Sequence, residues 1–196
     1  MFMKRRMSWL VTMTIILVVG VIVFYYFTNK ANDSDNGTNA NVVGEVDKVL
    51  NKDLKSRYPY TVKEVVQFFV QIQKCYYNEE YTEDELLKLA DKARELFDDE
   101  LLSENPVETY YENLKNEVKA YQSIGKTIYR VIIEENNDVV YSTVDGQKYA
   151  SINCTYYLKD EEGTTSIKET YILRKDENDR WKILGWEKYE GSEWEQ

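Results

Sequence analysis

The sequence of 196 residues has no histidine and only two cysteines. Histidine is the commonest acid/base group near neutral pH and the commonest metal ligand, so its absence removes the most usual catalytic and metal chemistry. Zinc sites need clustered Cys or His side chains, and Cys75 and Cys154 are far apart in the sequence. A Gly-rich phosphate loop and a nucleophile elbow are also missing. We therefore expect no metal site, no cofactor and no catalytic residues, and we predict that the protein is not an enzyme.

The two cysteines both lie in apolar stretches, Cys75 within a helical pattern and Cys154 within a strand pattern. Outside the cytoplasm two cysteines can form one disulfide, but a buried free cysteine also serves as a small hydrophobic residue. The sequence leaves both interpretations open and favours free thiols.

Acidic residues outnumber basic ones beyond the first thirty positions. Residues 1–30 carry four positive and no negative side chains, so residues 31–196 hold 21 basic and 35 acidic side chains, a net charge of −14. Binding of nucleic acid depends on lysine and arginine contacts with phosphate, and the sequence contains no basic patch. This distribution of charge excludes a nucleic-acid partner.

Long hydrophobic runs are rare as well, and the sequence has one. Trp9–Phe27 carries no charge and is long enough to span roughly 28 Å of hydrocarbon. Lys4, Arg5 and Arg6 precede it, which predicts a cytoplasmic N-terminus. A cleaved secretory signal is the alternative, but the run ends in bulky aromatic residues where signal cleavage needs small ones. We predict that residues 1–30 form the cytoplasmic N-terminus and a single-pass anchor in the cell membrane, with the C-terminal domain extracellular.

The remaining chain divides at about residue 43. Residues 31–43 are rich in Asn, Asp, Ser, Gly and Thr and have little to bury, which predicts a flexible tether. Residues 44–196 are enough for one domain with a single core. The sequence therefore predicts three parts: anchor, tether and an extracytoplasmic domain.

The first half of that domain has helical periodicity. A short apolar repeat begins at Val46, and three longer helices follow. Capping boxes, in which a Thr hydroxyl and a Glu carboxylate satisfy free backbone N–H groups, mark the first two starts at Thr61–Glu64 and Thr82–Glu85. The first of these helices is expected to end near Asn78, and the apolar face of the second extends to Phe97. The third starts at Asn105–Pro106 with an N-cap followed by proline.

From Lys126 onward, apolar residues recur at every second position, as they do in strands. The expected strands are Thr127–Ile133, Val139–Val144, Lys148–Leu158, Ser166–Arg174 and Arg180–Tyr189. Helices followed by consecutive antiparallel strands predict an α+β fold, with the three long helices packed on one face of a curved antiparallel sheet.

The last strand gives the most specific prediction of packing. Simple alternation places Trp181, Ile183 and Gly185 on one face and Lys182, Leu184 and Trp186 on the other. The first face lacks the charged lysine, so it is expected to meet the helices. Trp181 is therefore predicted to be a core residue.

This order of elements, with the strand Arg180–Trp186 after the acidic turn Asp176–Asp179, resembles the cone of nuclear transport factor 2-like proteins, which ketosteroid isomerase and cystatin-like folds share. The anchor, the tether and the segments Tyr58–Thr61, Cys75–Thr82 and Glu104–Pro106 also resemble an uncharacterised family of membrane-anchored proteins from anaerobic Gram-positive bacteria. The resemblance implies a cone-like extracytoplasmic domain. It implies no activity and no catalytic residues, because none is established for that family.

Tyrosine is abundant, with 17 in the chain. Pairs such as Tyr76–Tyr77, Tyr110–Tyr111 and Tyr156–Tyr157 are expected to direct one ring inward and one outward, where outward rings can form a contact surface. This favours a non-catalytic membrane-anchored module that binds a protein partner, a second copy of itself or a small apolar ligand. The alternative is a scaffold subunit of a membrane translocation or conjugation apparatus, since type IV secretion has a bitopic assembly factor of this topology and fold class.

A small-molecule isomerase-like or hydrolase-like enzyme is the third hypothesis. It would need a carboxylate base and a Tyr or protonated acid as oxyanion donor inside the cone. The strand region offers Glu169, Glu187 and Asp145, which the pattern places at exposed positions or in turns. A cavity that holds a desolvated carboxylate opposite a Tyr would favour this hypothesis.

Overall fold

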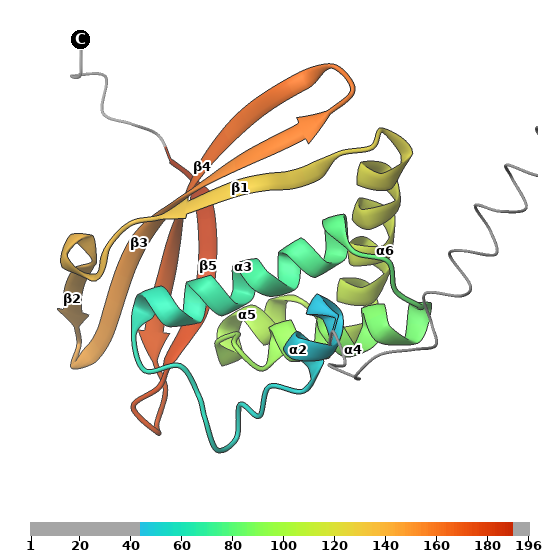
Figure 1. Ribbon diagram of the computed structural model, residues 1–196. Helices are drawn as coiled ribbons and strands as arrows, with labels where there is room; N and C mark the ends of the chain where they lie inside the picture. The colour runs from blue at the N-terminus through green and yellow to red at the C-terminus, as the bar shows by residue number, and fades with distance from the viewer. Residues whose placement is uncertain (1–43, 190–196) are drawn as a thin grey trace, which may run out of the picture. The chain divides into compact units, whose positions relative to one another are not determined.

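The computed structural model describes residues 44–189. The predicted anchor and tether lie outside the described residues, as do residues 190–196. The described part is an α+β domain in which helices precede an antiparallel sheet, as predicted (Figure 1). Within residues 44–189, none of the helices has the length and apolar character needed to cross a membrane.

The described part contains five α-helices, and two of them start at the predicted capping boxes. The predicted N-cap at Asn105 is wrong: Asn105 is the C-cap of the helix Asp99–Glu104, and Pro106 is the N-cap of the next helix, without a side-chain cap hydrogen bond. At Thr61 and Thr82 both capping boxes form: each Thr hydroxyl accepts from the backbone N–H three residues later, with distances of 3.1 Å and 3.2 Å. The carboxylates of Glu64 and Glu85 accept from the two capping N–H groups in return. The helices are α2 (Glu45–Leu50), α3 (Val62–Asn78), α4 (Glu83–Arg94), α5 (Asp99–Glu104) and α6 (Val107–Ser123).

Helix α4 ends earlier than its apolar pattern predicts. Leu96 and Phe97 leave the helix and run beside the last strand, where the Ile183 N–H donates to Leu96 O at 2.8 Å. The Asp98 N–H donates to Ile183 O at 2.8 Å in return. This segment extends the sheet by one short parallel bridge. It covers the outer edge of that strand, which would otherwise present unpaired backbone groups.

The strands lie close to their predicted positions, but they are not a simple meander. The sheet order is β1-β3-β4-β5, and β2 also pairs with β3. Strands β1 and β2 therefore share one edge of the long β3, and a 3-10 turn at Asn136–Asp138 separates them (Figure 1). The strands are β1 (Thr127–Ile133), β2 (Val140–Val144), β3 (Gln147–Asp160), β4 (Gly163–Lys175) and β5 (Trp181–Lys188).

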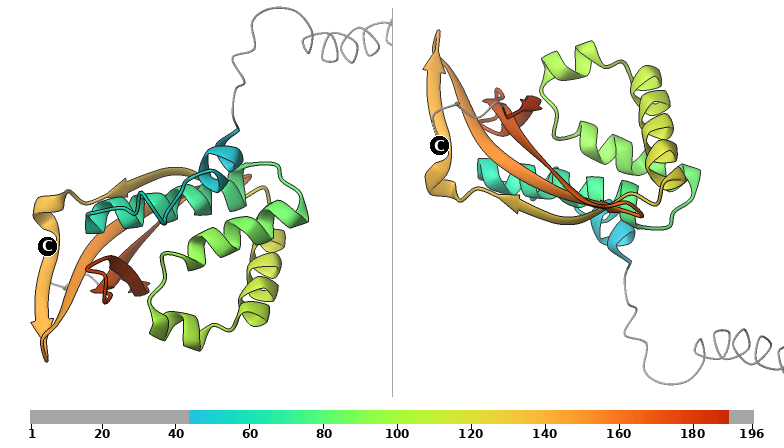
Figure 2. Two further views of the ribbon diagram at one scale, coloured as in Figure 1. Left: turned by 90° about the horizontal axis from the view of Figure 1, so that it is seen from below. Right: turned by 90° about the horizontal axis from the view of Figure 1, so that it is seen from above.

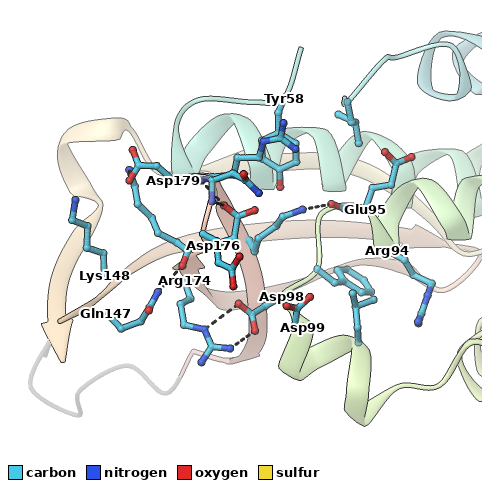
Figure 3. Close-up of a pocket in the computed structure, with 18 of the residues that line it drawn as sticks. Tyr58, Arg94, Glu95, Asp98, Asp99, Gln147, Lys148, Arg174, Asp176 and Asp179 are labelled. Atoms are coloured by element: carbon cyan, nitrogen blue, oxygen red, sulfur yellow. Dashed lines mark hydrogen bonds and ion pairs between the residues drawn. The ribbon is translucent and has the colours of Figure 1, made fainter. Parts of the chain in front are cut away.

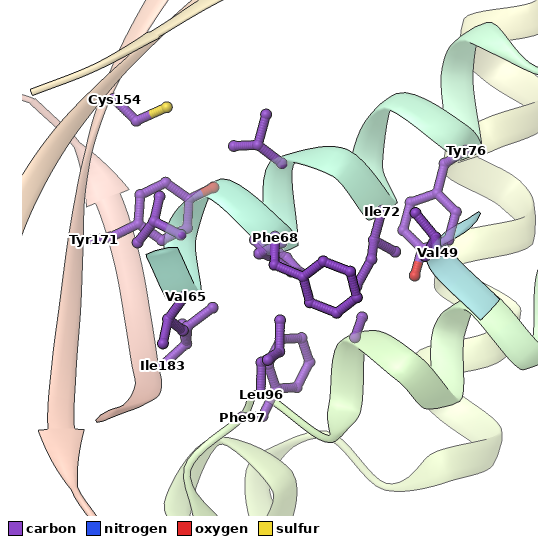
Figure 4. Packing of buried hydrophobic residues seen from close by; sticks show 14 of the residues in the cluster. Val49, Val65, Phe68, Ile72, Tyr76, Leu96, Phe97, Cys154, Tyr171 and Ile183 are labelled. Atoms are coloured by element: carbon purple, nitrogen blue, oxygen red, sulfur yellow. The ribbon is translucent and has the colours of Figure 1, made fainter. Parts of the chain in front are cut away.

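Helix α3 is the centre of the core. In both views of Figure 2 it lies between β1 and the group formed by α4, α5 and α6. The expectation that three long helices pack on one face of the sheet is therefore wrong in detail: α3 lies against the sheet, whereas α4 packs on α2 and α3, and α6 packs on α3 and α4. Phe68 and Ile72 of α3 contribute fully buried side chains, together with Leu96 and Ile183 (Figure 4).

Strand β5 contains a bulge that changes its inward face. Trp181 and Ile183 are buried, at 7% and 0% exposure, which confirms the predicted core position of Trp181. Beyond them Leu173 pairs with Ile183 while Tyr171 pairs with Trp186, so β5 carries one extra residue between the two pairs. Simple alternation is therefore wrong beyond Ile183, because a bulge shifts the pleat by one residue. Trp186 faces the helices.

Both cysteines are free and buried. Cys75 lies in α3 and Cys154 lies in β3, with 1% and 0% exposure. Burial raises the pKa of each thiol to about 12. Both side chains serve as small apolar core residues.

Candidate functional site

One hollow of the described domain is a charged groove. It has a volume of about 870 Å³ and lies between the Glu95–Asp99 segment, the start of β3 and the turn before β5 (Figure 3). Its charged side chains bond mainly to one another or to backbone. Arg174 Nε donates to Asp98 Oδ2 at 3.0 Å, and Lys182 Nζ donates to Glu95 O at 2.6 Å. These contacts hold the Glu95–Asp99 segment onto β4 and β5, so the groove has a structural explanation.

Another hollow is an aromatic cavity of about 300 Å³ between α3, α6, the Phe97–Asn105 segment and the sheet. Eight of its 18 lining residues are aromatic. The eight are Phe69, Tyr76, Tyr77, Phe97, Tyr110, Tyr121, Tyr156 and Trp186. The other ten are Gln73, Leu101, Asn105, Asn113, Leu114, Glu117, Ile128, Leu158, Ile167 and Glu169. We use the name aromatic cavity for this set.

Trp186 is the largest side chain of the aromatic cavity and is held by its neighbours. Its ring centroid lies 5.5 Å from Phe69, 5.8 Å from Tyr171 and 6.2 Å from Phe97. It nevertheless retains 40% exposure. Aromatic groups held in fixed geometry with an open face are typical of ligand walls, because they need little further ordering on binding.

A row of polar groups begins in the wall of the cavity at Gln73 and ends at Glu169. Tyr156 OH lies 2.7 Å from Gln73 Oε1 and 2.6 Å from Tyr171 OH, and Tyr171 OH lies 3.3 Å from Glu169 Oε2. Three contacts need three protons, and the two phenols supply two. The third comes from the Gln73 amide, turned to present its NH₂ group, or from a protonated Glu169. In both arrangements the two phenol protons are used within the row.

Two carboxylates are the charged groups of the cavity wall. Glu117 accepts a 2.6 Å hydrogen bond from Tyr77 OH. Desolvation raises the pKa of Glu169, and the charge of Glu117 raises it further, whereas the Tyr171 hydroxyl opposes the change. No lysine or arginine of the described chain lines this cavity. The cavity is therefore negatively charged when both carboxylates are ionised.

The predicted acids separate once the strands are in register. Glu187 and Asp145 are exposed, Asp145 in the turn between β2 and β3, as predicted. The placement of Glu169 at an exposed position or turn is wrong. It is half-buried on the inner face of β4, two residues before the buried Tyr171. The period of two from Glu169 through Tyr171 to Leu173 was the signal in the sequence that indicated this face.

The tyrosine pairs follow the inward and outward rule only in part. Tyr76 is buried and Tyr77 is half-buried, yet both line the aromatic cavity. Tyr156 is buried and Tyr157 is half-buried.

Among residues 44–189, no group of three or more His, Cys, Asp or Glu side chains is arranged to hold a metal ion.

Comparison with known proteins gives a family but no activity. A family model described as "Domain of unknown function (DUF6715)" matches residues 1–186. No curated protein matches the chain. The NMR solution structure of the transfer protein TraH from the Gram-positive conjugative plasmid pIP501 is 13% identical in sequence, with a TM-score of 0.35. The match covers 69% of this chain and 99% of that chain, and so low a TM-score supports no conclusion on fold or function.

Proposed function

The chain belongs to the family described as a domain of unknown function, DUF6715, and we propose that it is a non-catalytic module that binds a small ligand in the aromatic cavity. This membership confirms the expectation of an uncharacterised family. The cone-like, nuclear transport factor 2-like shape stays a prediction, as does the anchor that would hold the domain at the outer surface of the cell membrane.

The observation that carries the proposal is the aromatic cavity itself. Its volume of about 300 Å³ lies at the lower end of small-molecule sites, which are mostly apolar with a few converging polar groups. Phe69, Phe97 and Trp186 supply apolar surface, while Glu117 and Glu169 supply polar groups. This combination favours a ligand over a protein partner, because protein partners bind on broad surfaces.

An enzyme is a second candidate, and one observation favours it. Glu169 is a desolvated carboxylate beside Tyr171, as a proton-transfer site would require. However, an oxyanion needs donors that are free to bind it, and the protons of Tyr156 and Tyr171 are used within their own row. Exchange of α-protons of small ketones in D₂O, followed by NMR, tests this candidate. Exchange that Glu169→Gln abolishes would establish catalysis and contradict the non-catalytic proposal.

Strand β2 is a candidate surface for binding a protein partner. All five residues of this strand are exposed, with Val140 at 65%, Tyr141 at 59% and Val144 at 56%. Exposed apolar edge strands can pair with another chain. The hypothesis of a scaffold subunit in a translocation or conjugation apparatus stays a prediction. It expects genes for ATPase and channel subunits beside the gene for this chain.

The predicted location of the domain outside the cytoplasm has a direct test. Protease added to intact protoplasts should digest residues 44–196, because Lys4–Arg6 precede the uncharged run and predict a cytoplasmic N-terminus. The matched control is the same digestion after detergent lysis, which should remove the domain in either orientation. Full protection in intact protoplasts would place the domain inside.

The proposed ligand binding is tested by thermal unfolding of the full chain in a maltoside detergent with a library of small polar and apolar compounds. A compound at 100 times its dissociation constant stabilises the folded state by about 2.7 kcal/mol, a shift of several degrees. Trp186→Leu should remove the shift and the control Glu187→Gln should keep it, because Trp186 lines the cavity and Glu187 does not. A library in which no compound gives a shift that depends on Trp186 would contradict the proposal.

A further inference from the structure

We infer that the ligand of the aromatic cavity is a small organic cation whose ammonium head packs against the aromatic wall and faces Glu117 and Glu169. This inference rests on the proposed function and narrows it to one chemical class. It follows from the charge of the wall, the composition of the rings and the way this domain uses its own cations.

The charge of the wall has one sign. Glu117 and Glu169 are its charged groups, and the cavity holds no lysine or arginine among the described residues. Arg94 lies over Tyr110 at 5.4 Å and Lys126 over Tyr121 at 5.7 Å, but neither lines the cavity. Glu169 is half-buried and Glu117 is exposed. Their like charges repel each other, and a cation between them would offset that repulsion.

The rings are suited to such a cation. The face of an aromatic ring attracts cations through its quadrupole, and Trp gives the strongest interaction. Trp186 is 40% exposed, and Tyr77 stacks on Tyr121 with centroids 4.5 Å apart. Several rings that together surround an ammonium group form the aromatic cage that binds quaternary ammonium ligands.

Elsewhere the domain places its own cations on rings. Lys52 lies 3.9 Å from the centroid of Phe68, and Lys168 lies 3.8 Å from that of Tyr189. In the described chain no lysine or arginine covers the rings of Phe69, Phe97 or Trp186 in this way. The cavity thus offers aromatic rings and carboxylates without a cation of the chain, and an external cation would complete the arrangement.

Size and charge limit the ligand further. A volume of about 300 Å³ corresponds to about ten water molecules, enough for a short ammonium compound and too small for a long chain. Glu117 and Glu169 would repel a phosphate group. We therefore expect a simple ammonium compound to bind more tightly than its phosphate ester, which separates a free cation from a phosphocholine lipid headgroup. The net charge of −14 over residues 31–196 also attracts cations to the domain.

The test compares choline with its neutral isostere 3,3-dimethylbutan-1-ol, in which carbon replaces the charged nitrogen. Both are titrated calorimetrically into the full chain in a maltoside detergent, with phosphocholine as a third probe. We expect saturable binding of choline, with the affinity for the isostere and for phosphocholine lower by about tenfold or more, because both cation–π attraction and the carboxylates act on the charge.

Three variants identify the site. Trp186→Leu keeps an apolar side chain and should weaken choline binding by about tenfold, while Trp186→Phe should weaken it less. Glu169→Gln should weaken choline binding by about threefold or more and leave binding of the isostere unchanged. Glu187→Gln makes the same change of charge on the outer face of β5, where it does not line the cavity, and should have no effect. Thermal unfolding confirms that each variant is folded.

The possible outcomes separate the two proposals. Equal affinity for choline and its isostere overturns the cation inference and leaves a neutral-ligand site. Tighter binding of phosphocholine overturns the assignment of a free cation and favours a lipid headgroup. If choline and the isostere both fail to bind, the cation inference is wrong, and the proposed function then depends on the compound library alone.

Discussion

Glu169 combines burial and charge in a way that few residues of this domain do. It lies half-buried on the inner face of β4, with Tyr171 OH at 3.3 Å and the charge of Glu117 nearby. Desolvation raises the pKa of its carboxyl group above the ordinary value. An acidic side chain in this environment weakens the fold when it is ionised, which is typical of a group retained for binding.

The raised pKa predicts a specific dependence of stability on pH. Between the ordinary pKa and the raised one, the folded chain holds a proton that the unfolded chain has released, so stability falls as pH rises through this window. Glu169→Gln lacks this loss. We expect the unfolding free energy of the variant, relative to the natural chain, to increase from about pH 4 to about pH 7. Chemical denaturation at both pH values measures it.

The control for this experiment is Glu187→Gln, because Glu187 is exposed on the neighbouring strand. The unfolding free energy of Glu187→Gln, relative to the natural chain, should not increase with pH. A constant difference for Glu169→Gln, or one that decreases with pH, would show that Glu169 is not desolvated in the folded chain.

The two thiols give a second prediction at this scale. Burial raises the pKa of Cys75 and of Cys154 to about 12, and only the thiolate reacts with iodoacetamide. At about pH 8 we expect no alkylation of the folded chain and complete alkylation of both residues in denaturant, measured by mass spectrometry. Rapid alkylation of the native chain, or a disulfide between the two, would contradict their burial as free thiols.

At the scale of elements, the bulge in β5 decides what reaches the cavity. The extra residue between the pairs Leu173–Ile183 and Tyr171–Trp186 lets Trp181, Ile183 and Trp186 all face inward. A regular strand would place Trp186 on the outer face and leave the cavity without its largest aromatic wall. The one inserted residue therefore places Trp186 in the wall of the proposed site.

The same strand supports a stability test. Trp181 is 7% exposed, so Trp181→Ala removes a large buried ring and should cost about 3–5 kcal/mol of unfolding free energy. Trp194 is in the polar C-terminal segment outside the described residues, and Trp194→Ala should cost less than about 0.5 kcal/mol. Denaturant midpoints of the two variants give the comparison. Equal small effects would mean that β5 does not pack as described.

Sequence patterns predicted the elements well because their signals are local. The capping boxes at Thr61 and Thr82 and the strand alternation involve residues a few positions apart. Helix α5 was not predicted. Its N-cap Asp98 is buried against Arg174, which is distant in the sequence. The cavity could not be predicted for the same reason: it needs the β5 bulge and the placement of α6 beside α3.

At the scale of the whole molecule, residues 44–189 contain a continuous core that runs from α2 to β5. The core includes Val46 and Val49 near its start and Ile183 near its end. A fragment of residues 44–196 should therefore be soluble and unfold in one cooperative transition, as followed by circular dichroism. A fragment that begins at residue 52 lacks α2 and serves as the control, with lower stability expected. Aggregation or a non-cooperative transition of the longer fragment would place the domain boundary elsewhere.

The central claim is that the aromatic cavity is the binding site, and Trp186 reports on it directly. The four tryptophans of the full chain, labelled as 5-fluorotryptophan, should give separate ¹⁹F resonances that single Trp→Phe variants assign. On titration with a compound that stabilises the fold, we predict that the Trp186 resonance shifts and saturates while that of Trp194 stays unchanged. Ligand-induced shifts that spare Trp186, or that affect all four resonances equally, would contradict the account.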